Sequence, residues 1–205
     1  MSRKNPDLNN FERTESRIEK IKNVLNKRQL SLTVVAENIY DPHNLSAMIR
    51  SCDAVGVFEV CLVYDGTQPF PKLGKKSSAS AIKWINIKKF KSIENCYKYL
   101  RDQGKLIYTT HLGMKSKSLF ELDLTQNIAL VFGNEHNGLS EKAVELADEN
   151  FLIPQVGFVQ SLNISVATAV SLYEAFRQRN NKNMYSKPEI NGYKYEEILN
   201  NWLKK

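Results

Sequence analysis

Short apolar runs alternate with helix-like stretches along most of this chain. The runs have the length of strands and lie at residues 32–39, 59–64, 84–87, 105–112, 127–132 and 151–153. Between most of them, apolar residues recur every three or four positions, as in helices that bury one face. This alternation predicts an α/β fold with a mostly parallel sheet flanked by helices.

The stretch 151–179 is the strongest candidate for a binding element. Pro154 ends the strand, and Gly157 lies in the loop that follows. Ser161 and Asn163 are residue types that favour helix starts, where free N–H groups can hold the polar edge of a small molecule. The helix after them is apolar nearly all round, so we expect it to be buried. An ordinary strand–loop–helix unit is the alternative interpretation.

A second candidate lies in the helix pattern after residue 44. Asn44 is expected to be its N-cap, and Arg50, six residues later, departs from its apolar stripe. Both could border one cleft at the carboxyl end of the preceding strand. The alternative is an ordinary cap and a surface arginine.

The turn 133–140 follows the buried strand 127–132 and is bracketed by glycines. Ser140 is predicted to cap the next helix. Glu135 lies inside this turn, where we expect it to meet a cation or a hydroxyl, with Arg50 as one candidate partner. A turn glutamate that faces water is the alternative.

The two ends of the chain carry amphipathic helix patterns, at residues 11–28 and 195–205. We therefore divide the chain into a basic N-terminal helical arm (1–30), one catalytic domain (31–180), and a linker with a last helix (181–205). The last helix is too small to stand alone, so it is expected to dock on the domain, on a second subunit or on RNA.

The formal net charge is +7 and the pI is about 9.2, which favours a polyanionic partner. The basic residues cluster near the N-terminus and in the loop that holds Lys75 and Lys76. The apolar runs are too short to span a bilayer, and the N-terminus does not resemble a signal peptide, so we expect a cytoplasmic protein without a membrane partner. The three cysteines and three histidines lack metal-ligand spacing, so no metal is expected.

Three stretches carry a family resemblance: NIYDPHNLSAMIRSCDAVG, LVFGNEHNGLSEKA and FLIPQVGFVQSLNISVATAVSLYEAFRQR. In this order they resemble the motifs of the SpoU/TrmH family of RNA 2′-O-methyltransferases, in the SPOUT superfamily. The resemblance implies S-adenosylmethionine as methyl donor, a homodimer and a C-terminal trefoil knot. Because the terminal helices are short and no RNA-binding domain is added, the chain looks most like the members that methylate guanosine 18 in the D-loop of tRNA.

The resemblance also assigns roles residue by residue. The implied catalytic positions are Arg50, Asn44, Glu135, Ser161 and Asn163, and the implied donor-binding positions are Thr110, Gly133, Ile153 and Leu162. For contact with tRNA we select Arg13, Arg17, Lys20, Lys75, Lys76, Arg177 and Arg179. The chain departs from the family pattern at Asn134, His136, Asn137 and Gln155, which bears on substrate preference.

Two other functions stay open at this point. One is 2′-O-methylation of a different RNA, either rRNA or the anticodon loop of tRNA. The other is a non-catalytic RNA-binding protein on the same scaffold, although such a protein has no need of Arg50, Glu135 and Asn163 together.

Overall fold

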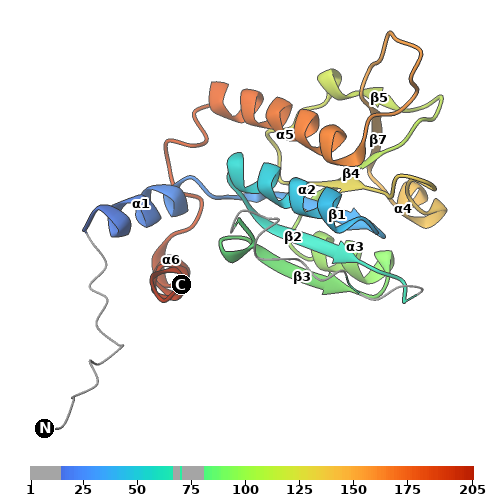
Figure 1. Ribbon diagram of the computed structural model, residues 1–205. Coiled ribbons are helices and arrows are strands. Elements are labelled where there is room, and N and C mark those ends of the chain that lie inside the picture. Colours follow the sequence, from blue (N-terminus) through green and yellow to red (C-terminus); the bar gives the residue numbers. More distant parts are fainter. Residues whose placement is uncertain (1–14, 67–69, 71–80) are drawn as a thin grey trace, which may run out of the picture.

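A computed structural model of the chain describes residues 15–66, 70 and 81–205. Within these residues, seven strands form one parallel sheet in the order β3-β2-β1-β6-β4-β7-β5 (Figure 1). The strands are β1 (Gln29–Glu37), β2 (Val57–Val63), β3 (Asn86–Phe90), β4 (Leu106–Thr110), β5 (Lys117–Ser118), β6 (Ile128–Phe132) and β7 (Glu149–Leu152). The predicted α/β fold with a parallel sheet is confirmed.

Helices cover both faces of this sheet. The helices are α1 (Glu15–Asn26), α2 (Pro42–Ala54), α3 (Ile93–Arg101), α4 (Glu141–Glu145), α5 (Ile164–Asn181) and α6 (Gly192–Leu203), with short 3-10 turns at Ala81–Lys83 and Leu119–Glu121. Figure 1 shows α2 and α5 side by side on one face, with α3 on the other. Parallel strands need such crossover helices, which is why both faces are apolar.

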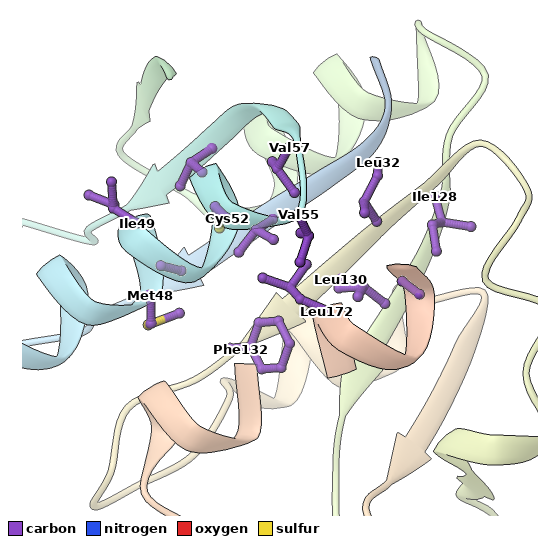
Figure 2. Packing of buried hydrophobic residues seen from close by; sticks show 14 of the residues in the cluster. Leu32, Met48, Ile49, Cys52, Val55, Val57, Ile128, Leu130, Phe132 and Leu172 are labelled. Carbon is purple, nitrogen blue, oxygen red and sulfur yellow. The ribbon is translucent and has the colours of Figure 1, made fainter. Parts of the chain in front are cut away.

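The larger core lies between the sheet and the pair α2 and α5. Met48, Ile49 and Cys52 of α2 are one turn apart or adjacent and point at the strands (Figure 2). They pack in one buried cluster with Phe132 of β6 and Leu172 of α5. This packing fixes where both helices begin, and thereby positions the loops at the carboxyl edge of the sheet.

Two helical details differ from the sequence expectations. Helix α2 begins at Pro42, and the carboxylate of Asp41 caps it by accepting a hydrogen bond from the His43 amide at 2.8 Å. The expectation that Asn44 is the N-cap is therefore wrong, because proline fits the first helical position and moves the cap upstream. Helix α5 is not buried all round, since Val166 and Tyr173 are 46% and 55% exposed.

Helices α1 and α6 pack on each other beside the sheet. Ile21 and Leu25 of α1 form a separate apolar cluster with Leu199 and Trp202 of α6. The last helix thus docks on the same chain, one of the three partners expected for it. The boundaries of arm, catalytic domain and linker stay predictions. In the part of the chain that the structure describes, no helix has the length and apolar character needed to cross a membrane.

Candidate active site

Three segments that are distant in sequence meet at the carboxyl edge of the sheet. The Nδ2 of Asn44, in the first turn of α2, donates to Oε1 of Glu135 in the turn after β6. The Oδ1 of Asn44 accepts from Nδ2 of Asn163 at 3.1 Å. One asparagine side chain therefore joins all three predicted motifs through its donor and its acceptor.

Asn163 has a second task, because it is the N-cap of α5. Its Oδ1 accepts from the Ser165 amide at 2.9 Å and from the Ser165 hydroxyl at 2.6 Å. The side chain is thus held by the helix that follows it and by Asn44. Such a doubly held amide keeps one orientation, which a site for group transfer requires.

The turn 133–140 is closed by a pair of backbone hydrogen bonds between Asn134 and Gly138, both at 3.0 Å. Gly138 adopts a φ of +68°, in the left-handed region. A Cβ on Gly133 would lie 2.1 Å from the carbonyl carbon of Gly138, so only glycine fits there. The amide oxygen of Asn134 accepts from the His136 and Asn137 amides at 2.9 and 2.7 Å. The turn that carries Glu135 is therefore internally braced.

Glu37 also supports this turn, and the sequence analysis missed it. Its carboxylate, only 4% exposed at the end of β1, accepts from the amide and the hydroxyl of Ser140 at 2.9 and 2.8 Å. Burial raises the pKa of Glu37, and the bonds from Ser140 oppose that rise. Ser140 also caps α4, as predicted. The sequence could have pointed to Glu37, because an acidic residue inside an apolar strand run is unusual.

Arg50 and Ser161 do not join this network. Both side chains are exposed, and among the described residues neither forms a hydrogen bond or an ion pair. The expected partnership between Arg50 and Glu135 is not present, since Glu135 is held by Asn44 instead. An arginine without a partner among the described residues is available to an anion from outside.

The predicted donor-binding residues lie around the loop 153–163. Ile153 and Leu162, at its two ends, are half-buried. Thr110 lies at the end of β4, where its hydroxyl donates to the Val131 carbonyl at 3.1 Å. Ile153 and Leu162 are apolar, and the Thr110 hydroxyl is already bonded. The groups that a bound donor could approach closely are therefore Gly133 and the backbone of the loop.

The loop itself offers hydrogen-bonding groups without partners. Among the described residues, no backbone group of 154–162 forms a backbone hydrogen bond. The Oε1 of Gln155 is buried and has no hydrogen-bond partner in the part of the chain that the structure describes. Unpaired buried polar atoms are rare in folded proteins and suggest a missing ligand or water. The residues thus fit a donor such as S-adenosylmethionine, which carries amino, hydroxyl and carboxylate groups.

The predicted RNA-binding residues fall into three groups. Arg13, Lys75 and Lys76 lie outside the described residues, whereas Arg17 and Lys20 are exposed on α1. Arg177 is exposed and pairs with Glu174 at 2.7 Å. Contact of these exposed cations with RNA stays a prediction.

Arg179 requires a correction, because it is fully buried. Its guanidinium donates to the carbonyls of Leu124, Ser31 and Gln126 at 2.9, 3.0 and 2.7 Å, and to two side-chain oxygens. All its donors face protein oxygens, so it fastens the last turn of α5 and is not accessible to RNA. The sequence suggested otherwise because Arg177 and Arg179 look alike at the end of a basic helix.

No group of three or more histidine, cysteine or acidic side chains within the described ranges is arranged to hold a metal ion. All three cysteines are buried and free.

Comparison with known proteins places these features in a family. The sequence pattern of the SpoU rRNA Methylase family matches residues 31–173. The tRNA (guanosine(18)-2′-O)-methyltransferase of Thermus thermophilus is 42% identical over 95% of this chain and 99% of that protein.

Two solved structures are also similar. The Aquifex aeolicus TrmH/SpoU tRNA modifying enzyme superposes with a TM-score of 0.87 at 38% identity, covering 93% of this chain and 96% of that one. The SpoU methyltransferase AviRb of Streptomyces viridochromogenes, solved with the cofactor AdoMet, superposes with a TM-score of 0.68 at 26% identity over 77% of this chain and 64% of that one. Sequence and fold together show that this chain belongs to the SpoU rRNA Methylase family.

Proposed function

We propose that this chain transfers the methyl group of S-adenosylmethionine to the ribose 2′-oxygen of guanosine 18 in tRNA. The hydrogen-bonded set of Asn44, Glu135 and Asn163, at the edge where the loop 153–163 leaves the sheet, carries this proposal. It is supported by the Thermus thermophilus relative, whose full length the chain matches.

The chemistry asks two things of the protein. The sulfonium of the donor makes its methyl group electrophilic without a metal. The chain must align the ribose hydroxyl and help its proton to leave, because a neutral hydroxyl is a weak nucleophile.

Glu135 and Asn44 are placed to orient the hydroxyl. Oε1 of Glu135 is held by Asn44, whereas Oε2 accepts no hydrogen bond from a described residue. Oε2 is therefore available to accept one from the ribose 2′-hydroxyl. Asn163, fixed as the cap of α5, and Ser161 shape the loop on the donor side.

Arg50 supplies positive charge to the RNA. Its guanidinium stays protonated under ordinary conditions, so it acts by charge and hydrogen bonding to the 2′-oxygen or the adjacent phosphate. Its exposure and lack of a partner among the described residues support this role.

Arg17 and Lys20 on α1, together with Arg177, extend the cationic surface that receives the tRNA backbone. Contacts of this kind make binding depend on salt, because each neutralised phosphate releases counterions. Arg13, Lys75 and Lys76 belong to the same proposal by sequence alone.

A homodimer and a trefoil knot are part of the proposal. Large apolar side chains are exposed on the segments that leave β4 and β7: Leu112, Met114, Val156, Phe158 and Val159. Clustered exposed apolar residues mark protein interfaces. After β7, near one edge of the sheet, the chain returns to pack α5 on α2, the kind of return path from which a knot can arise. We place the enzyme in the cytoplasm, with its tRNA.

Methyl transfer from labelled S-adenosylmethionine tests the function. Unmodified tRNA and rRNA are offered separately, and the product nucleosides are mapped by mass spectrometry. We expect 2′-O-methylguanosine at position 18 of the D-loop. Label in rRNA or in the anticodon loop alone would refute the substrate, and donor binding without any transfer would refute the enzyme in favour of an RNA-binding protein.

A further inference from the structure

A polar cavity lies at the opposite edge of the sheet, where the strands begin. It has a volume of about 480 Å³. Its walls come from the starts of β1 to β4, from the end of α3 and from the segment before α6; they include Thr33, Glu59, Asn86, Tyr99 and Lys105. None of these residues belongs to the methyl-transfer site.

The sheet register aligns polar side chains in this cavity. Thr33 of β1 pairs with Glu59 of β2, and Glu59 pairs with Asn86 of β3. Paired residues of neighbouring strands point to the same face, so these three side chains form one row. Two residues further along, the same face is apolar on β1 and β2, with Val35 and Cys61 in the core below α3, whereas the exposed Lys88 of β3 continues the polar lining at the outer strand. On β1 and β2 the polar row is thus confined to one position.

Two opposite charges are buried here without contacting each other. Glu59 is 9% exposed; it accepts from Asn86 Nδ2 at 2.7 Å and from the Tyr99 hydroxyl at 3.0 Å. Lys105 is 4% exposed and donates to the Leu30 carbonyl at 2.5 Å and to Asn127 Oδ1 at 2.9 Å. Among the described residues neither side chain forms an ion pair. Each charge is held only by neutral groups, although buried charges are usually paired.

Thr33 points to a missing ligand. Its side chain is fully buried in the cavity wall, and its hydroxyl has no hydrogen-bond partner among the described residues. A buried hydroxyl without a partner is costly and is usually satisfied by water or a ligand.

We propose that this cavity binds a small zwitterion of the free α-amino acid class. Its ammonium group lies against the Glu59 carboxylate, and its carboxylate accepts from Lys105. The Thr33 hydroxyl, which has no accessible surface in this structure, donates to the same carboxylate once its side chain turns toward the cavity. Leu30 and Phe58, which also line the cavity, contact its short apolar part.

Three other charged residues line the cavity, but Lys88 and Lys194 are exposed to solvent, and the Glu189 carboxylate accepts from the amide and hydroxyl of Ser31. A zwitterion is therefore the ligand that neutralises both buried charges, Glu59 and Lys105.

Calorimetric titration tests the proposal on the full chain. Each standard L-amino acid is added separately up to about 10 mM, a range that reveals millimolar affinities. At least one is expected to bind at a single saturable site. The Thr33→Val and Glu59→Gln variants are nearly isosteric, and each should weaken that binding by about tenfold or more. Because the Thr33 hydroxyl has no hydrogen-bond partner among the described residues, its valine variant should fold normally.

Glu94→Gln, at the other end of α3, is the matched control and should bind as the wild type does. Absence of binding by every amino acid would show that the cavity holds only water and would overturn the proposal. Equal binding to the wild type, Thr33→Val and Glu59→Gln would also overturn it, because the amino acid would then occupy another site such as the donor loop. Methyl transfer is measured separately and does not decide this outcome.

Discussion

The amide of Asn163 donates to the side-chain oxygen of Asn44 across 119 residues of sequence, at 3.1 Å. This bond ties the first turn of α5 to the first turn of α2. It makes the geometry of Glu135 depend on both helices, because Glu135 is held by the same Asn44 side chain.

Replacing Asn44 by alanine should lower kcat for tRNA methylation by about a hundredfold, since Glu135 loses its only partner among the described residues. Ser51→Ala in the same helix is the control, because its hydroxyl donates to the Ala47 carbonyl within α2 and takes no part in this network. Steady-state methyl transfer measures both. If the kcat of Asn44→Ala equalled that of the wild type, this hydrogen-bond network would have no part in the mechanism.

Arg50→Ala should abolish measurable transfer while the melting temperature stays close to that of the wild type, because the exposed side chain forms no hydrogen bond or ion pair with a described residue. Arg50→Lys should recover only part of the activity, since an ammonium lacks the planar fork of guanidinium. Near-normal turnover of the alanine variant would contradict the proposed role.

Gly133→Ala should destabilise the protein by about 3 kcal/mol and abolish donor binding, because its Cβ would meet Gly138 at 2.1 Å. Gly157→Ala is the matched control in the donor loop, where an added Cβ meets nothing within 4 Å. Chemical denaturation and equilibrium binding of S-adenosylmethionine provide the two readouts. Equal stability of the two variants would show that the turn can relax.

Arg179→Ala should lower the free energy of unfolding by about 3–5 kcal/mol, because it strips buried carbonyls of their donors. Arg177→Ala should lower the free energy of unfolding by less than Arg179→Ala does, because only its Glu174 partner is buried, and should weaken tRNA binding with a smaller dependence on salt. Denaturation and binding at several salt concentrations separate the two arginines. A stable Arg179→Ala with weak tRNA binding would restore its role in RNA contact.

Lys105 should make stability rise with pH. Burial lowers its pKa from the ordinary 10.5 to about 8 in the folded protein, so between these values the unfolded chain binds more protons. The contribution of Lys105 to the free energy of unfolding therefore rises with pH between about 8 and 10.5, by at most about 1.4 kcal/mol per pH unit. Below this window the contribution is constant. Denaturation from pH 7 to 10 should show a shallower slope in Lys105→Met than in the exposed control Lys88→Met. Identical slopes would contradict the shift.

Sequence periodicity was sufficient for all strands but β5 and for most helices, because burial repeats every two or every three to four residues. It erred at Asn44 because the helix already begins at Pro42, with Asp41 as its cap, and the apolar pattern starts only after residue 44. It missed the short strand β5 because two residues carry no periodicity.

The sequence predicted which residues belong to the candidate site better than it predicted which side chains contact each other there. Loops at the carboxyl edge were expected to meet, but which side chain holds Glu135 depends on helix rotation, which no local pattern encodes. The burial of Arg179 likewise depends on carbonyls contributed by the segment before β6. The amino-edge cavity gave no signal, since its polar row appears only when three strands lie in register.

Helix α5 is anchored at both of its ends. Asn163 fixes its beginning at the methyl-transfer edge, and Arg179 fixes its last turn to Ser31 at the opposite edge, beside the cavity. An α-helix of 18 residues is about 27 Å long and resists compression along its axis. The helix therefore links the two edges of the sheet at a fixed length, so a residue inserted into or deleted from α5 would put one of its two anchors out of register.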